Sequence, residues 1–170
     1  MNIRAETTED IAAIDALTYR AFENHPHHKP GAKPSEHLII NQLRQANALT
    51  LSLVYEDHTG IVGHIALSPI TINHAADQWY GLGPISVAPE RQGQGIGSAL
   101  IQAGLEQIKT MGAQGVALLG EPQYYGRFGF KQLDELTLPG VPAEYFLAKV
   151  FSAEIPTGSV SYHPAFLVTD

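Results

Sequence analysis

At 170 residues, with 44% hydrophobic content, no cysteine and a net charge of −7, the chain is long enough for one domain over residues 1–170 and too short for two. The missing cysteines exclude a disulfide framework, a thiolate metal site and a cysteine nucleophile. The acidic balance argues against a nucleic-acid surface, and no apolar run is long enough to span a membrane, so we expect a cytoplasmic protein with neither partner.

The first part of the chain predicts a strand, two helices and a loop between them. Residues 2–5 read as a short strand, and apolar residues at helical spacing cover 11–22. The loop over 23–34 carries three prolines, and Ser35 can cap the helix that follows. The loop also holds three imidazoles, which leave a metal site open: His25, His27 and His28. Because loop imidazoles are more often solvated than ligating, we expect no metal.

From residue 49 the apolar period changes to two. Residues 49–56 and 61–73 predict a β-hairpin, and residues 79–87 follow as a fourth, antiparallel strand. Pro84 lies inside that fourth strand and cannot donate to a hydrogen-bond ladder. We therefore expect a bulge at Pro84 that leaves one side of the strand open. His64, in the second arm of the hairpin, is expected to be a core histidine rather than a catalytic one.

The second half of the chain changes the topology of the sheet. Helical spacing from residue 98 is followed by an apolar run over 116–119, and strand, helix, strand implies a parallel pair with a right-handed crossover. A strand over 145–151 and an extended segment over 159–168, interrupted at Pro164, close the chain. The predicted fold class is α/β, with a mixed and mostly antiparallel sheet flanked by helices.

The strongest chemical signal is the stretch VAPERQGQGIGS at residues 87–98, which runs from a strand through a glycine loop into a helix. Glycines let a backbone approach a ligand closely, and the first N–H groups of a helix lack intrahelical partners, so such a turn binds phosphate. A Walker loop is excluded because no Gly-Lys-Ser/Thr occurs, and a dinucleotide fingerprint would follow an opening strand rather than lie halfway along the chain.

Two motifs resemble the GNAT superfamily of N-acetyltransferases. Gln92-x-x-Gly95-x-Gly97 resembles the Gln/Arg-x-x-Gly-x-Gly/Ala loop that binds the acyl-CoA pyrophosphate in that family, between the fourth strand and the third helix. Tyr125-x-x-x-Gly129-Phe130 resembles the second family signature, after the fifth strand. Residues 82–84, 124–130 and 162–166 further resemble the YhbS-type subgroup of bacterial acetyltransferases, so the resemblance covers almost the whole chain.

The resemblance implies a GNAT fold, in which the fourth and fifth strands splay apart and the pantetheine of acetyl-CoA lies in the gap. The backbone of the fourth strand would then face the pantetheine, and the amides of the glycine loop would face the pyrophosphate. The residues implied for the cofactor are Ile85, Ser86, Val87, Gln92, Gly93, Gln94, Gly95, Ile96, Gly97 and Ser98.

The resemblance also makes Tyr125 the candidate acid that protonates the departing CoA thiolate, since a phenol with a pKa of about 10 stays protonated at neutral pH. The alternative is a packed aromatic residue whose hydroxyl bonds a nearby carbonyl. Tyr124 is expected to be structural or to line the acceptor site. The general base is left open among Glu121, His64 and the loop histidines, because the fourth strand has no carboxylate.

We therefore predict an acetyl-CoA-dependent N-acetyltransferase that acts on a primary amine of a small molecule or peptide, by direct attack through a tetrahedral intermediate. The alternative is a non-catalytic or regulatory module that binds acyl-CoA. The acidic charge mildly favours a cationic amine, and the two C-terminal extended segments suggest a homodimer. The identity of the acceptor and the preferred acyl length are not indicated by the sequence.

Overall fold

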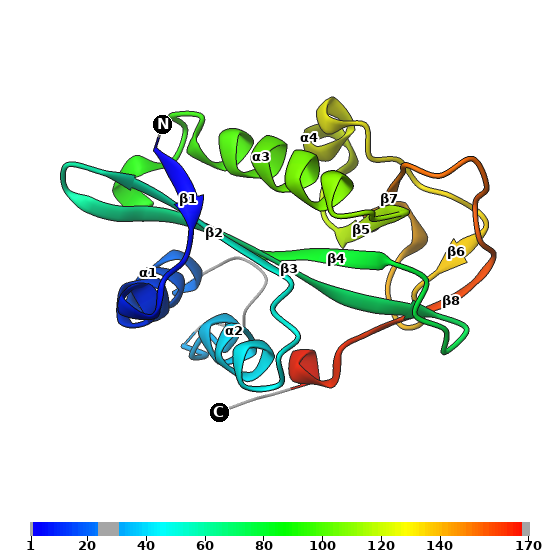
Figure 1. Ribbon diagram of the computed structural model, residues 1–170, viewed down its shortest axis with the longest axis horizontal. Coiled ribbons are helices and arrows are strands. Elements are labelled where there is room, and N and C mark those ends of the chain that lie inside the picture. The colour runs from blue at the N-terminus through cyan, green and yellow to red at the C-terminus, as the bar shows by residue number, and fades with distance from the viewer. Residues whose placement is uncertain (1, 24–30, 168–170) are drawn as a thin grey trace.

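The computed structural model describes residues 2–23 and 31–167, which form helices packed on a twisted sheet of eight strands (Figure 1). The strands are β1 Ile3–Ala5, β2 Leu51–Asp57, β3 Gly60–Ile72, β4 Trp79–Val87, β5 Gly115–Leu119, β6 Leu136–Thr137, β7 Phe146–Val150 and β8 Gly158–Tyr162. Their order is β1-β2-β3-β4-β5-β7, with β8 against the end of β3 and β6 against β8. Neighbouring strands are antiparallel except β4 with β5 and β6 with β8.

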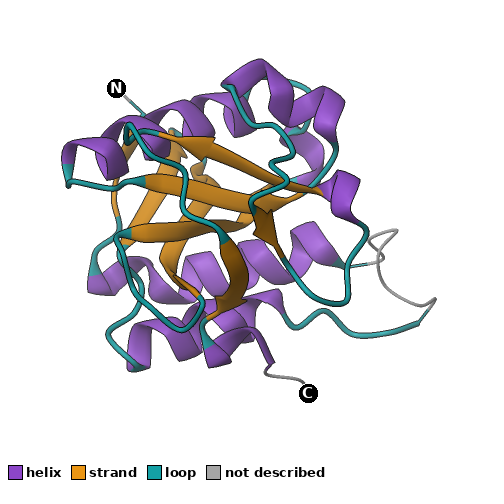
Figure 2. Cartoon of the chain, turned by 90° about the vertical axis from the view of Figure 1, so that its right-hand side faces the viewer, coloured by secondary structure: helices purple, strands orange, loops and turns teal. Residues whose placement is uncertain are grey.

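Helices cover both faces of this sheet (Figures 1 and 2). The helix α3, Ile96–Thr110, lies on one face, and α1, Ile11–Phe22, lies with α2, Glu36–Gln45, on the other. A short helix α4, Pro122–Tyr125, follows β5 directly. None of the helices in the described ranges is long and apolar enough to cross a membrane.

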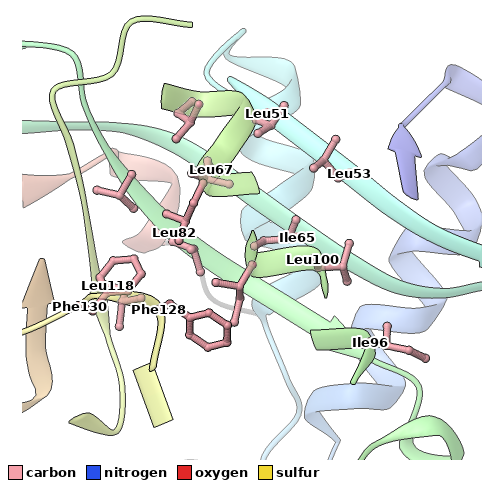
Figure 3. Packing of buried hydrophobic residues seen from close by; sticks show 14 of the residues in the cluster. Leu51, Leu53, Ile65, Leu67, Leu82, Ile96, Leu100, Leu118, Phe128 and Phe130 are labelled. Carbon is pink, nitrogen blue, oxygen red and sulfur yellow. The ribbon is translucent and has the colours of Figure 1, made fainter. Parts of the chain in front are cut away.

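The larger part of the core lies between α3 and the sheet, where alternate residues of the strands meet one face of the helix (Figure 3). Ile65 and Leu67 of β3 pack against α3 at Gly104, and Leu100 and Ile101 of α3 are fully buried. Burial of each such side chain contributes about 1.5–3 kcal/mol to folding. This packing fixes α3, and therefore the loop before it, against β3 and β4.

A chain of polar contacts runs from Arg44 of α2 through Glu6 to the buried Ser52 of β2 and His64 of β3. Arg44 of α2 forms a bidentate ion pair with Glu6, at 2.9 Å for each contact, and the Ser52 hydroxyl donates to Glu6 Oε1 at 2.5 Å. Because that hydroxyl donates its proton to Glu6, it accepts a hydrogen bond from the Nε2–H group of His64 at 2.7 Å. The neutral imidazole therefore carries no proton on Nδ1. Burial is the main cause that lowers the pKa of His64, to about 4.

The structure confirms the mixed sheet with its parallel β4–β5 pair, the bulge in β4 and the burial of His64. The extended segment predicted over 159–168 is wrong in its second half, because β8 ends at Tyr162 and Pro164–Leu167 form a 3-10 turn. Pro164 ends the strand because it has no N–H for a ladder. The short β6 was not predicted, since two residues carry no readable period. Ser35 is the N-cap residue of α2, but its side chain makes no capping hydrogen bond.

Candidate active site

The parallel strands β4 and β5 separate after three paired residues. Trp79–Gly81 pair with Gly115–Ala117, and the described residues give β4 no partner on this side beyond that point. On the other side, Ile65 pairs with Ile85 but Leu67 pairs with Leu82, so β4 carries one more residue than β3 across the bulge. The edge of β4 from residue 82 to 87 is therefore open along the fork between the two strands.

The glycine loop continues from this open edge. Gly93 and Gly95 have φ of 78° and 86°, in the left-handed region that favours glycine, and α3 begins immediately after Gly95. The first helical hydrogen bond of α3 runs from the Ala99 amide to the Gly95 carbonyl, so the amides of Ile96, Gly97 and Ser98 precede the helical ladder. These N–H groups lie at the positive end of the helix dipole.

Side chains around the loop hold its backbone in place. Arg91 forms an ion pair with Asp57 at the end of β2 and donates to Gln94 Oε1 at 2.9 Å. Hydrogen bonds from the Thr59 hydroxyl and from Arg91 hold the pKa of Asp57 well below its usual range. Gln92 donates through Nε2 to the Val87 carbonyl at 3.3 Å. The loop is thus anchored to the β2–β3 hairpin and to the end of β4.

Tyr125 lies at the end of α4, on the β5 side of the fork. Its ring is packed so closely against Gly120 that a Cβ at Gly120 would lie 2.3 Å from the ring, and it makes edge contacts with Tyr124 and Phe130. The side chain is half-buried, and burial raises the pKa of Tyr125 above its ordinary value of 10.0, with Tyr124 adding to the shift. The phenol is therefore protonated at neutral pH.

A cavity of about 1140 Å³ opens at the fork and extends toward the C-terminal segment. On the fork side it is lined by residues 82–85 of β4, by residues 119–121, and by Tyr124 and Tyr125. On the far side it is lined by residues 160–163, Phe166 and Leu167, by Leu138, Pro139 and Val141, and by Phe22, Glu36 and Ile39 from α1 and α2. We call the far side the outer chamber.

The structure brings some of the predicted site residues together. Ile85 and Tyr125 line the same cavity, while Ser86, Val87 and residues 92–98 continue along the β4 edge into α3. Of the candidate bases, Glu121 lines the cavity and His64 does not. His25, His27 and His28 lie outside the described residues, and no group of acidic or histidine side chains in the described ranges is arranged to hold a metal ion.

Sequence reasoning missed the residues of the outer chamber. Glu36 and His163 both line it, and His163 Nδ1 accepts the Ala165 amide at 3.0 Å, so the neutral ring carries its proton on Nε2. Residues 162–166 stood out only by resemblance. No local period signals that these distant segments meet at one cavity.

Comparisons with known proteins agree with this geometry. A family model described as an acetyltransferase (GNAT) domain matches residues 49–132. The uncharacterized N-acetyltransferase YhbS of Escherichia coli (strain K12) is 32% identical over 98% of both chains. The chain belongs to the GNAT acetyltransferase family. The resemblance inferred from Gln92, Gly95, Gly97 and Tyr125 is thereby confirmed at the level of the family.

Two solved GNAT structures extend the likeness to the whole fold. A GNAT acetyltransferase from Brucella melitensis, in complex with acetyl-CoA, is 44% identical over 96% of both chains with a TM-score of 0.84. YhbS from Escherichia coli, in complex with CoA, superposes with a TM-score of 0.87 over 99% of this chain and 92% of that one. The chain therefore has the GNAT fold, including the parallel pair β4 and β5 that splays apart.

Proposed function

We propose that this GNAT protein transfers the acetyl group of acetyl-CoA to a primary amine of a small molecule or peptide. The observation that carries the proposal is the continuity of three features along the fork: the open edge of β4, the glycine turn that starts α3, and the phenol of Tyr125 in the same cavity. The complexes of the Brucella relative with acetyl-CoA and of YhbS with CoA support the choice of donor.

In this proposal the donor is bound mainly by backbone. The amides of residues 92–98 and the dipole of α3 hold the pyrophosphate, and the open edge at Ile85, Ser86 and Val87 holds the pantetheine. The side chains at 86 and 87 matter less, since Ser86 is buried and Val87 packs against the core. Because the chain has only ten lysines and arginines, a backbone site suits its composition.

The chemistry follows from the groups that line the cavity. The neutral amine attacks the thioester carbonyl carbon, so that a C–N bond forms and a tetrahedral oxyanion results. When this intermediate collapses, the C–S bond breaks and the thiolate takes the phenolic proton of Tyr125. The proton lost by the amine goes to solvent, with Glu121 as a carboxylate lining the cavity, and the Tyr125 phenolate takes up a proton from solvent, so the net products are the amide and the neutral thiol.

The test is thiol release from acetyl-CoA over a panel of amines and peptides, with the N-acetyl product identified by mass spectrometry. We expect CoA and the acetylated amine to appear in equal amounts. Calorimetry with acetyl-CoA is the companion measurement. Tight binding of acetyl-CoA without turnover on any acceptor would contradict the proposal and favour the alternative of a binding module.

A homodimer belongs to the same proposal. β7 is the last strand on the main path of the sheet, and beyond it the described residues add only the bridge between Lys131 and Ala148. An edge of this kind can pair with a strand of a second copy. Light scattering on the purified chain checks this, and a mass equal to 18.4 kDa over the working concentration range would exclude it.

A further inference from the structure

The outer chamber is lined mainly by apolar side chains. Its walls include side chains of phenylalanine, isoleucine, leucine, valine and proline, and in the described part of the chain it has no lysine or arginine. Among the described residues the carboxylates that line the cavity are Glu36 and Glu121, and Glu36 already accepts the Ser35 amide at 3.1 Å.

Tyr162 adds to the apolar wall. Its hydroxyl oxygen is buried and its ring packs over Gly81, at the last paired residues before the fork. Burial raises the pKa of Tyr162, so the phenol stays neutral.

The chamber also leaves apolar surface uncovered. Six large apolar side chains are exposed in the described ranges, and three of them line the cavity: Leu119 and Tyr124 on the fork side and Leu167 in the outer chamber. Leu167 is 82% exposed. Exposed apolar surface costs about 25 cal/mol per Å², and its concentration at one concave site is typical of a surface that a ligand covers.

The location of the chamber assigns it to the acceptor rather than to the donor. The segment that matches the family model, residues 49–132, supplies the fork side of the cavity. The outer chamber is built by residues before and after that segment, from α1, α2, the loop at 138–141, β8 and the turn after it. Elements outside residues 49–132, the segment shared for donor binding, are the ones that can differ between proteins that acetylate different acceptors.

We propose that the acceptor is a monoamine with an apolar body, whose hydrocarbon or aromatic part fills the outer chamber while its amine points to the fork. This inference rests on the proposed function and names its substrate class. A polyamine, an aminoglycoside or a basic peptide would place additional ammonium groups against largely apolar walls, where Glu36 is the one carboxylate among the described residues of the outer chamber, and transfer of a charge to an apolar site costs free energy.

The experiment compares amines of matched length with acetyl-CoA as donor. We expect kcat/KM to rise along the linear series from propylamine to hexylamine by about fourfold for each methylene that is fully buried. Hexylamine should exceed cadaverine, which carries a second ammonium in place of the methyl group, by tenfold or more, and phenethylamine should react well. A preference for cadaverine or spermidine would overturn the inference.

Two variants test the location. Leu167→Glu places a charge at the chamber rim, and since the residue is exposed the fold should tolerate it. We expect the ratio of hexylamine to cadaverine activity to fall about tenfold. Met111→Glu is the matched control, because Met111 is 53% exposed at the end of α3 and does not line the cavity, and its ratio should equal that of the wild type. Equal ratios in both variants would exclude the chamber as the acceptor site.

Two further measurements separate the possible failures. With hexylamine fixed, acetyl-CoA should be used at least as well as hexanoyl-CoA, and a clear preference for hexanoyl-CoA would mean that the chamber holds the acyl chain of the donor instead. Acetyl-CoA binding measured by calorimetry separates the two proposals. Binding with no turnover on any amine rejects the transferase, whereas turnover that favours charged amines rejects only the apolar acceptor.

Discussion

The two sides of the cavity are built in different ways. The donor side uses backbone: an open strand edge and a turn with two glycines in the left-handed region, anchored by Arg91 and Gln92 within one short stretch of sequence. The outer chamber, the proposed acceptor side, uses side chains from α1, α2, the loop at 138–141, β8 and the turn after it. Backbone sites need particular residues at fixed spacing and therefore leave motifs, whereas a side-chain wall can be assembled from any apolar residues that the fold brings together.

The sharpest test of this division is Tyr125→Phe, which removes one hydroxyl from the fork and leaves both walls in place. Because the proton for the thiolate is lost, we expect kcat to fall by about 10²-fold. The affinity for acetyl-CoA, measured by calorimetry, should stay within about twofold since the ring still fills its place against Gly120. Tyr145→Phe, at an exposed tyrosine outside the cavity lining, is the control. An unchanged rate in Tyr125→Phe would remove the acid role.

Gly120→Ala probes the same tyrosine through its support. The new Cβ would lie 2.3 Å from the Tyr125 ring, so the ring must move. We expect kcat to fall by about 30-fold, because a displacement of about 1 Å in a catalytic group can cost up to 10²-fold in rate. Gly126→Ala, in open space after α4, should leave the rate nearly unchanged. Combining Gly120→Ala with Tyr125→Phe should add little to the loss, and additive losses would show that Gly120 acts by another route.

Gly95→Ala tests the backbone of the donor side. Gly95 has a φ of 86°, and an alanine there costs about 1–2 kcal/mol or shifts the turn. We expect the dissociation constant of acetyl-CoA to rise about tenfold. Gly112→Ala is the matched control, because Gly112 has a φ of 98° just after the other end of α3. Both variants should lose similar stability on denaturant titration, and a comparable loss of acetyl-CoA affinity in both would mean that the strain is global.

The difference between the two sides of the cavity also explains which parts of the structure the sequence predicts. The strands, the bulge at Pro84 and the motifs around Gly95 and Tyr125 are local features with readable periods or spacings, and the fold and family they predict are confirmed. The outer chamber was not predicted because it depends on tertiary packing that brings Phe166 and Ile39, far apart in the sequence, into one cluster beside the cavity. The cationic amine that the net charge of −7 mildly favours stays a prediction, because net charge is summed over the whole chain and does not describe the cavity itself.

The smallest expected effect concerns the face of the sheet beneath the donor strand, where His64 pairs with Ser86 across β3 and β4. The pKa of His64 is lowered from 6.5 to about 4, so the unfolded chain binds this proton more readily than the folded one. The contribution of neutral His64 to the free energy of unfolding is therefore complete above pH 6.5 and is lost as the pH falls toward 4. Between about pH 7.5 and about pH 5.5 we expect a loss of about 1 kcal/mol in the free energy of unfolding, measured with urea.

His64→Gln should remove most of this pH dependence, because an amide can still donate toward Ser52 and does not titrate. His58→Gln, at an exposed histidine of the β2–β3 turn, should keep it. If His64 acts on the donor strand only through the stability of the fold, acetyl-CoA binding at pH 5.5 should fall in proportion to the fraction of folded protein. The folded protein itself should then bind acetyl-CoA with unchanged affinity. A stability that stays constant over this pH range would mean that His64 is not held neutral by burial, and that charge is tolerated beneath the donor strand as it is at the protein surface.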